Sequence, residues 1–223
     1  MTRDLDTRRP RGRPPGPGVD AAVRREELLD AAEQVIARTG PSVSFSDIAV
    51  EAGFARTAVY AMYPDQRALV HALAVRHTER ITMQANTILD QHRPVRELLA
   101  ELIDLFCSFV EANPKLHPLL MQDWYSDDAT GSQRPMFNRS ADWATTVLET
   151  IMRSTDVVLP AGAARAWACA TVGAMLMAAE DWSTTGTISR AQLVEQLTAF
   201  IWPAIASVGG EQVSGPIVPE SRA

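Results

Sequence analysis

The sequence is poor in the features that mark secreted and membrane proteins. It holds two cysteines, Cys107 and Cys169, in 223 residues. Both lie in apolar helical patterns, which predicts buried thiols in a reducing compartment, with a redox pair as the alternative. The alanine-rich stretch 166–179 is too short to span a membrane. The N-terminus is rich in arginine but lacks the apolar segment of a signal peptide. We therefore expect a cytoplasmic protein.

Motifs for catalysis and metal binding are also missing from the sequence. The four histidines, His71, His77, His92 and His117, show no metal-ligand spacing with cysteines or carboxylates. No glycine-rich phosphate loop, nucleophile elbow or clustered His/Ser/Asp motif occurs. The sequence therefore predicts no metal and no cofactor, and an all-α enzyme is the weakest of the alternatives considered.

No segment alternates like a half-buried strand, whereas helical periodicity recurs along most of the chain. The expected fold is all-α, with about nine helices. Helices are expected at about 23–39, 44–52, 56–62, 66–90, 94–112, up to 127, 135–154, 160–184 and 190–207. The expected organisation is a disordered basic arm (1–19), a small three-helix domain (20–66), a larger helical bundle (67–208) and a disordered tail (209–223).

The segment 42–69 contains the pattern of a helix-turn-helix. Ser44 and Asp47 have the spacing of a capping box, which satisfies free backbone donors at a helix start. Gly53 stands where the chain must turn, because glycine tolerates positive φ at little cost. A second short helix, 56–62, then directs Val59 inward. The second helix of such a pair can enter the major groove of DNA.

These residues resemble the TetR (tetracycline-repressor) family of bacterial regulators over about residues 22–72. The matching positions are Ser44, Asp47, Ile48, Ala49, Ala52, Gly53, Tyr60, Tyr63 and Leu69. The resemblance implies a homodimeric transcriptional regulator, most often a repressor, that binds a palindromic operator. It also implies a C-terminal domain for effector binding and dimerisation, and release of the operator by a small molecule.

Four positions depart from the family pattern. Ala55 stands where Ser or Thr usually caps the second helix, and Ala58, Met62 and Gln66 replace customary Thr, His and Lys residues. Several usual DNA contacts are therefore absent. The alternative function is a helical protein that binds small molecules and has weak or no operator binding.

Charge is distributed unevenly along the chain. The formal net charge is −6, yet residues 1–25 carry seven arginines and three aspartates. DNA affinity depends on local neutralisation of phosphates, so a basic arm on an acidic body fits a protein that touches DNA at one end. Arg11-Gly12-Arg13 resembles an AT-hook, which can lie in a narrow minor groove. The alternative is a solubilising tail.

Candidate DNA contacts therefore lie in the arm and around the second helix of the motif. Arg56 and Thr57 begin that helix and can reach base edges, although Arg56 has a phosphate contact as its alternative. Tyr60 resembles the family's phosphate-contacting tyrosine, with packing as its simpler role. The full set of candidates is Arg11, Arg13, Ser44, Ser46, Arg56, Thr57, Tyr60, Tyr63 and Arg67.

The C-terminal half is rich in aromatic and methionine residues. Such residues usually form core, but the resemblance favours an effector cavity, and apolar cavities suit apolar or aromatic small molecules. The candidate pocket residues are Phe106, Met121, Trp124, Tyr125, Trp143, Val147, Trp167, Met175 and Trp182.

Two late helices carry stripes that fit a two-fold interface. Small residues on the first allow close helix approach, and the second carries large apolar residues. The candidate dimer residues are Ala166, Ala170, Gly173, Met177, Leu193, Leu197, Phe200 and Ile201. The alternative for both stripes is a core within one chain.

Overall fold

The computed structural model describes residues 21–125, 135–155, 157–213 and 215–217. In this part the chain forms nine α-helices and no strand, which confirms the predicted all-α fold. They are α1 (Ala21–Thr39), α2 (Phe45–Ala52), α3 (Arg56–Met62), α4 (Gln66–Leu89), α5 (Val95–Ala112), α6 (His117–Tyr125), α7 (Pro135–Thr155), α8 (Ala163–Thr185) and α9 (Arg190–Ser207). No helix in these ranges is long and apolar enough to cross a membrane.

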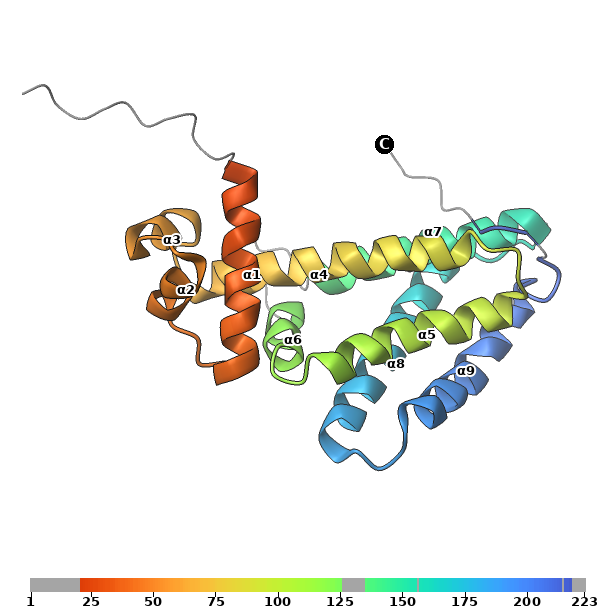
Figure 1. Cartoon of the computed structure of the whole chain (residues 1–223). Coiled ribbons are helices and arrows are strands. Elements are labelled where there is room, and N and C mark those ends of the chain that lie inside the picture. The colour runs from red at the N-terminus through yellow and green to blue at the C-terminus, as the bar shows by residue number, and fades with distance from the viewer. Residues whose placement is uncertain (1–20, 126–134, 156, 214, 218–223) are drawn as a thin grey trace, which may run out of the picture.

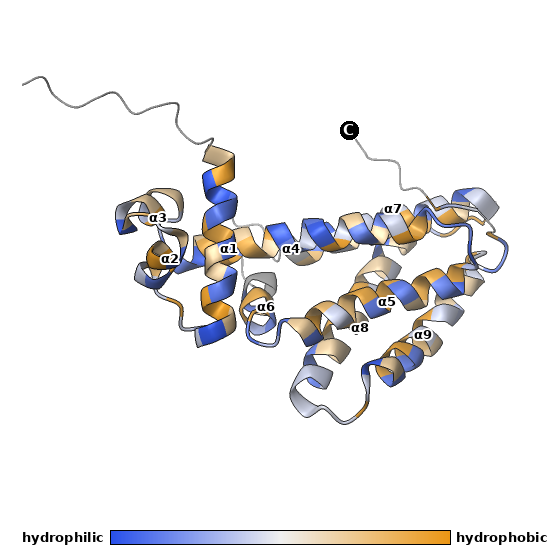
Figure 2. Ribbon diagram, in the orientation of Figure 1, coloured by the Kyte–Doolittle hydropathy of each residue, from blue (hydrophilic) through white to orange (hydrophobic). Residues whose placement is uncertain are grey.

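The helices form two bundles joined by α4 (Figure 1). We call residues 21–65, with α1 to α3, the head, and residues 66–217, with α4 to α9, the body. The long helix α4 starts beside the head and runs to the far end of the body, while α6 lies close to α1. Figure 2 shows hydrophobic and hydrophilic residues interleaved along α1, α5 and α9, as expected for helices with one buried face.

The helix α4 contributes to two separate apolar cores. Its first half, with Leu69 and Leu73, packs with α1 to α3 and with Leu119 and Leu120 of α6. Its last residues, Ile88 and Leu89, pack instead with the body core formed mainly by α5, α7, α8 and α9. A change in the position of α4 therefore affects both cores.

Polar contacts also tie the body to the head. Arg76 of α4 is only 7% exposed and pairs with three carboxylates of α1. Its guanidinium lies 2.7 Å from Asp30 Oδ1 and 3.2 Å from Glu26 Oε2, and it also contacts Glu33. At the other end of α1, Lys115 Nζ donates to the carbonyl oxygens of Ala37 and Arg38 at 2.9 and 2.8 Å. Such a contact satisfies carbonyls left free at a helix C-terminus.

The segment after α9 differs from the disordered tail that the sequence predicts for 209–223. Val213 and Ile217 are buried in the body core, and Ile217 N donates to Leu89 O at 2.9 Å. Gly209 has φ +93°, and a Cβ there would lie 2.5 Å from Thr155 Oγ1. Two apolar side chains in a polar segment therefore hold it against the end of the body. Residues 214 and 218–223 lie outside the described part.

Candidate DNA-binding head and ligand cavity

Local hydrogen bonds fix the two short helices of the head. Ser44 Oγ accepts a hydrogen bond from Asp47 N at 3.1 Å and donates one to Asp47 Oδ2 at 2.7 Å. Gly53 ends α2 with φ 69° and ψ 25°, the left-handed conformation that the turn requires. Ala55 precedes α3 and provides no side-chain cap. The predicted helix-turn-helix is thus present, with α3 held by its neighbours rather than by its own cap.

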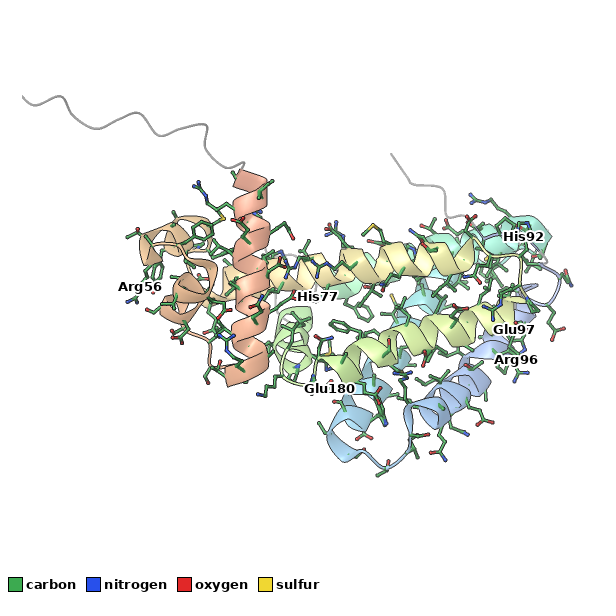
Figure 3. All side chains as sticks on the ribbon, viewed as in Figure 1. Arg56, His77, His92, Arg96, Glu97 and Glu180 are labelled. Carbon is green, nitrogen blue, oxygen red and sulfur yellow. The ribbon has the colours of Figure 1, made fainter. Side chains whose placement is uncertain are left out.

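The outer face of α3 presents polar groups to solvent. Arg56 and Thr57 are exposed, and Figure 3 shows Arg56 at the outer edge of the head. Arg56 Nη2 donates to Tyr60 Oη at 3.1 Å, and its guanidinium carbon lies 5.3 Å from the Tyr60 ring centroid. The Tyr60 ring packs on Phe45 with centroids 4.9 Å apart. This arrangement fixes an arginine and a hydroxyl on one exposed surface.

Tyr63 does not share this surface, contrary to the prediction that it contacts DNA. It is 3% exposed, and its hydroxyl is buried without a hydrogen-bond partner in the described chain. Burial also raises the pKa of this phenol. Tyr63 follows the last residue of α3, where the chain turns inward, so the side chain joins the head core.

The other predicted DNA contacts have varied environments. Ser46 is half-buried in the first turn of α2, and Arg67 is exposed in the first turn of α4. The hydroxyl of Ser44 is engaged in the cap of α2. Arg11 and Arg13 lie outside the described residues.

A partly open cavity of about 160 Å³ lies in the body between α4, α5, α7 and α8, and Ile205 of α9 also lines it. Among the residues that the structure describes, no lining side chain is charged. The hydroxyls of Thr78, Thr82, Ser140 and Thr171 are the polar groups of its side-chain lining, apart from the indole of Trp143. The Trp143 Nε1 donates to Asn86 Oδ1 at 2.8 Å, so it is already satisfied. The cavity suits an uncharged, mainly apolar molecule.

Only some of the residues predicted to form the pocket line this cavity. Phe106, Trp143, Val147 and Met175 line it, and Met121 lines a smaller chamber beside it. The side chains of Trp124 and Tyr125 lie outside the described part.

Two predicted tryptophans are not part of the cavity wall. Trp182 Nε1 donates to Ile188 O at 2.8 Å, at the turn between α8 and α9. Trp167 packs against the body core from outside the lining. Both rings pack against other parts of the body. An aromatic residue on a helix that borders a cavity can point toward the cavity or away from it, and these two point away.

Sequence reasoning missed the contribution of α4 to the cavity. Thr78, Ile81, Thr82 and Ala85 of α4 all line it. Their spacing of three, four and seven residues places them on one helix face. This stripe of small and hydroxyl residues is a signal that the sequence already contains, but it is weaker than the tryptophans of the C-terminal half.

The predicted dimer residues divide into an exposed set and a buried set. On α8, Ala166 and Ala170 are exposed, and Met177 is 48% exposed. A Cβ added at Gly173 would meet nothing within 4 Å, and Phe200 of α9 is 73% exposed. These residues therefore lie on an exposed surface of α8 and α9 in the described chain.

The buried set is a correction to the predicted interface. Leu193, Leu197 and Ile201 are at most 7% exposed and pack in the body core, where α9 lies against α5. These side chains belong to the core of the chain itself. Periodicity places them correctly on one apolar face, but that face is covered by α5.

A helix-turn-helix head on a hollow helical body defines a helix-turn-helix transcriptional regulator. Residues 28–73 match the family model of bacterial regulatory proteins of the tetR family. Residues 82–217 match the model of the tetracyclin repressor-like C-terminal domain. The chain belongs to the TetR family of transcriptional regulators.

Individual relatives agree with this assignment. An uncharacterized HTH-type transcriptional regulator of Mycobacterium tuberculosis is 26% identical over 189 residues, covering 83% of this chain and 78% of the relative. A TetR-like regulator from Rhodococcus sp. RHA1 has TM-score 0.58 and 24% identity, covering 85% of this chain and 99% of that one. The Thermus thermophilus repressor FadR, solved with lauroyl-CoA, has TM-score 0.65 and 17% identity, covering 80% and 93%. The solved structures share the fold.

Proposed function

We propose that this protein is a homodimeric, ligand-responsive repressor that binds a near-palindromic operator through its two heads. The observation that carries the proposal is the exposed face of α3, where Arg56, Thr57 and Tyr60 stand together on a helix-turn-helix. An arginine at the start of such a helix can bond guanine O6 and N7, and a tyrosine hydroxyl can bond phosphate. The repressor role rests on the resemblance to the TetR family.

Residues 20–66 would form the DNA-binding domain, and residues 67–208 the domain for effector binding and dimerisation. Between residues 42 and 67 the bases are Arg56 and Arg67, against three acids. The head therefore needs additional positive charge to neutralise phosphates. The arm, with Arg11 and Arg13, would supply it in the minor groove beside the α3 contacts.

The effector would be a small, mainly apolar molecule bound in the body cavity. The described residues that line the cavity carry no charge, and a charged group buried among them would lose hydration without gaining a partner. FadR of T. thermophilus is a repressor solved with lauroyl-CoA. An acyl chain fits the character of this cavity, whereas the phosphates of coenzyme A would have to remain outside it.

The second subunit would pack on the exposed surface of α8 and α9. Small residues at Ala166, Ala170 and Gly173 permit close approach of a partner helix, and Phe200 adds a large apolar contact. A Cβ at Gly173 would meet nothing within 4 Å, and Gly173→Leu would add a bulky side chain to that surface. We expect the variant to sediment as a monomer with its helix content unchanged, whereas an intact dimer at micromolar concentration would place the interface elsewhere.

The helix α4 would connect the effector to the head. Thr78 and Ile81 line the cavity, and Arg76, within two turns, is held by the carboxylates of α1. A ligand that fits the cavity better in one position of α4 would shift the population toward that position. The two heads would then be spaced wrongly for adjacent half-sites of the operator.

The proposal is tested by sequencing genomic DNA fragments that the protein retains, followed by affinity measurements over a range of salt concentrations. We expect one or a few near-palindromic sites. Deleting residues 1–18 should lower the slope of log affinity against log salt by about 2 if two or three arginines contact the DNA. Retention of no specific fragment would favour the alternative, a helical ligand-binding protein without an operator.

A further inference from the structure

A smaller chamber, lined in part by α6, adjoins the main cavity. Thr78, Ile81, Phe106 and Leu176 line both spaces, so the two lie next to each other. The chamber has a volume of about 20 Å³. A polar cavity of this size accommodates about one water molecule or one hydroxyl group.

One residue that lines the chamber, His117, has a buried polar atom that nothing in the described chain satisfies. His117, the first residue of α6, is 3% exposed, and its Nε2 is buried without a hydrogen-bond partner. The other histidine that lines the chamber, His77, has its Nε2 2.7 Å from Glu33 Oε1. A buried polar atom left unpaired costs free energy, so a group that pairs with His117 gains affinity.

We propose that the effector carries one uncharged hydroxyl group, which passes Phe106 and forms a hydrogen bond with His117 Nε2, while its apolar part fills the main cavity. This inference rests on the proposed ligand site and specifies its chemistry. The ligand class is therefore an aliphatic or aromatic alcohol rather than a pure hydrocarbon or a carboxylate.

The chemistry of the site favours a hydroxyl over other polar groups. A hydroxyl both donates and accepts, so it fits His117 in either neutral tautomer. Burial lowers the pKa of His117, which keeps the imidazole neutral. A carboxylate would find no arginine or lysine among the described residues that line the two spaces, and His77 already faces Glu33.

The test compares 1-hexanol with n-hexane as probes of equal chain length. Their dissociation constants are measured from the fluorescence of Trp143 and the other tryptophans, for wild type, His117→Phe, His117→Gln and His92→Phe. His117→Phe keeps an aromatic ring but removes the nitrogen. It should raise the dissociation constant of 1-hexanol about tenfold and change that of n-hexane less than twofold. His117→Gln should recover part of the 1-hexanol affinity, and His92→Phe, at an exposed histidine far from the chamber, should change neither.

If His117→Phe lowered the affinities for 1-hexanol and n-hexane equally, the inference would be overturned. His117 would then only line the chamber, without a hydrogen bond to the ligand. Should that variant fail to fold, the ¹⁵N resonance of His117 Nε2 in wild type decides. It should shift with 1-hexanol but not with n-hexane, and a resonance unmoved by 1-hexanol would overturn the inference. The proposed function is judged separately, because operator retention and its release by another apolar ligand do not require His117.

Discussion

The head and the body are both built from amphipathic helices, yet the cavities described above lie in the body. Leu28, Ile48 and Val59 of the head are fully buried, as is Leu69 of α4, which packs with them. The cavity and its chamber both lie in the body. Close packing holds side chains in fixed positions. We infer that close packing in the head holds the α3 surface in a fixed position. Looser packing in the body leaves room for a ligand.

Adding volume to each interior tests this comparison most strongly. Ala32→Leu, at a fully buried alanine of the head core, should destabilise the protein by about 3 kcal/mol, because overpacking forces its neighbours apart. Ala144→Leu adds the same atoms in the body cavity. It should lower the free energy of unfolding by less than about 1 kcal/mol, or raise it. Urea unfolding measures both. Equal losses would mean that the cavity closes in solution and that the two interiors do not differ.

Operator binding should depend on the head and not on the far end of the body. Arg56→Ala should weaken operator binding by about 1–3 kcal/mol and relax the preference at one base pair. The matched control is Arg96→Ala, at an exposed arginine near the opposite end of the molecule in Figure 3. Fluorescence anisotropy with operator variants separates the outcomes. A loss that is uniform over all sequences would assign Arg56 to a phosphate instead.

The junction of head and body should show a characteristic dependence on pH. Burial alone would raise the pKa of Glu33, but hydrogen bonds with His77 and Arg76 outweigh it and lower the pKa. Its stabilising effect is therefore complete above the ordinary pKa of glutamate and is lost as the pH falls through the lowered value. Glu33→Gln should lower the free energy of unfolding by about 1 kcal/mol at pH 7. The difference in this free energy between the variant and wild type should shrink below about pH 4.

Unfolding curves between pH 7 and pH 3 check this expectation. Glu27→Gln, at an exposed glutamate of the same helix, is the control and should follow wild type throughout. A difference between Glu33→Gln and wild type that is constant with pH would show that the charge of Glu33 plays no part at the junction.

Tyr63→Phe should have the smallest effect. Because the Tyr63 hydroxyl is buried and unpaired, its removal should leave stability unchanged or raise it by less than about 1 kcal/mol, with operator affinity unaltered. Tyr60→Phe, in contrast, removes a hydroxyl from the exposed face of α3 and should weaken operator binding. If Tyr63→Phe bound the operator more weakly than wild type, the result would show that the Tyr63 hydroxyl contacts DNA.

The features predicted well from the sequence depend on neighbouring residues. The cap at Ser44 and the turn at Gly53 each involve contacts within a few residues, and both are present. Helix boundaries follow from such local signals, so the all-α fold and the helix order could be predicted.

The features predicted poorly depend on which distant element covers a given face. Leu197 and Phe200 lie on the same helix, but only the former is covered by α5. Tyr63 is a predicted DNA contact, yet its side chain is buried where the chain turns into α4. The cavity arises from incomplete filling between four helices, so no single periodic stripe reveals it. Ile217 was missed because its packing partner, Leu89, is far away in sequence.

The central claim is that occupancy of the body cavity controls DNA binding by the head. The most direct test uses an apolar ligand that releases the operator, and measures its affinity with and without saturating operator DNA. Operator must weaken ligand binding by the same factor by which the ligand weakens operator binding, because the two couplings are thermodynamically equal. In Ala144→Leu, the leucine side chain occupies space in the cavity. The factor by which operator weakens ligand binding and the factor by which ligand weakens operator binding should then both approach one. A ligand that occupies the cavity of the wild-type protein while operator affinity stays constant would contradict the account.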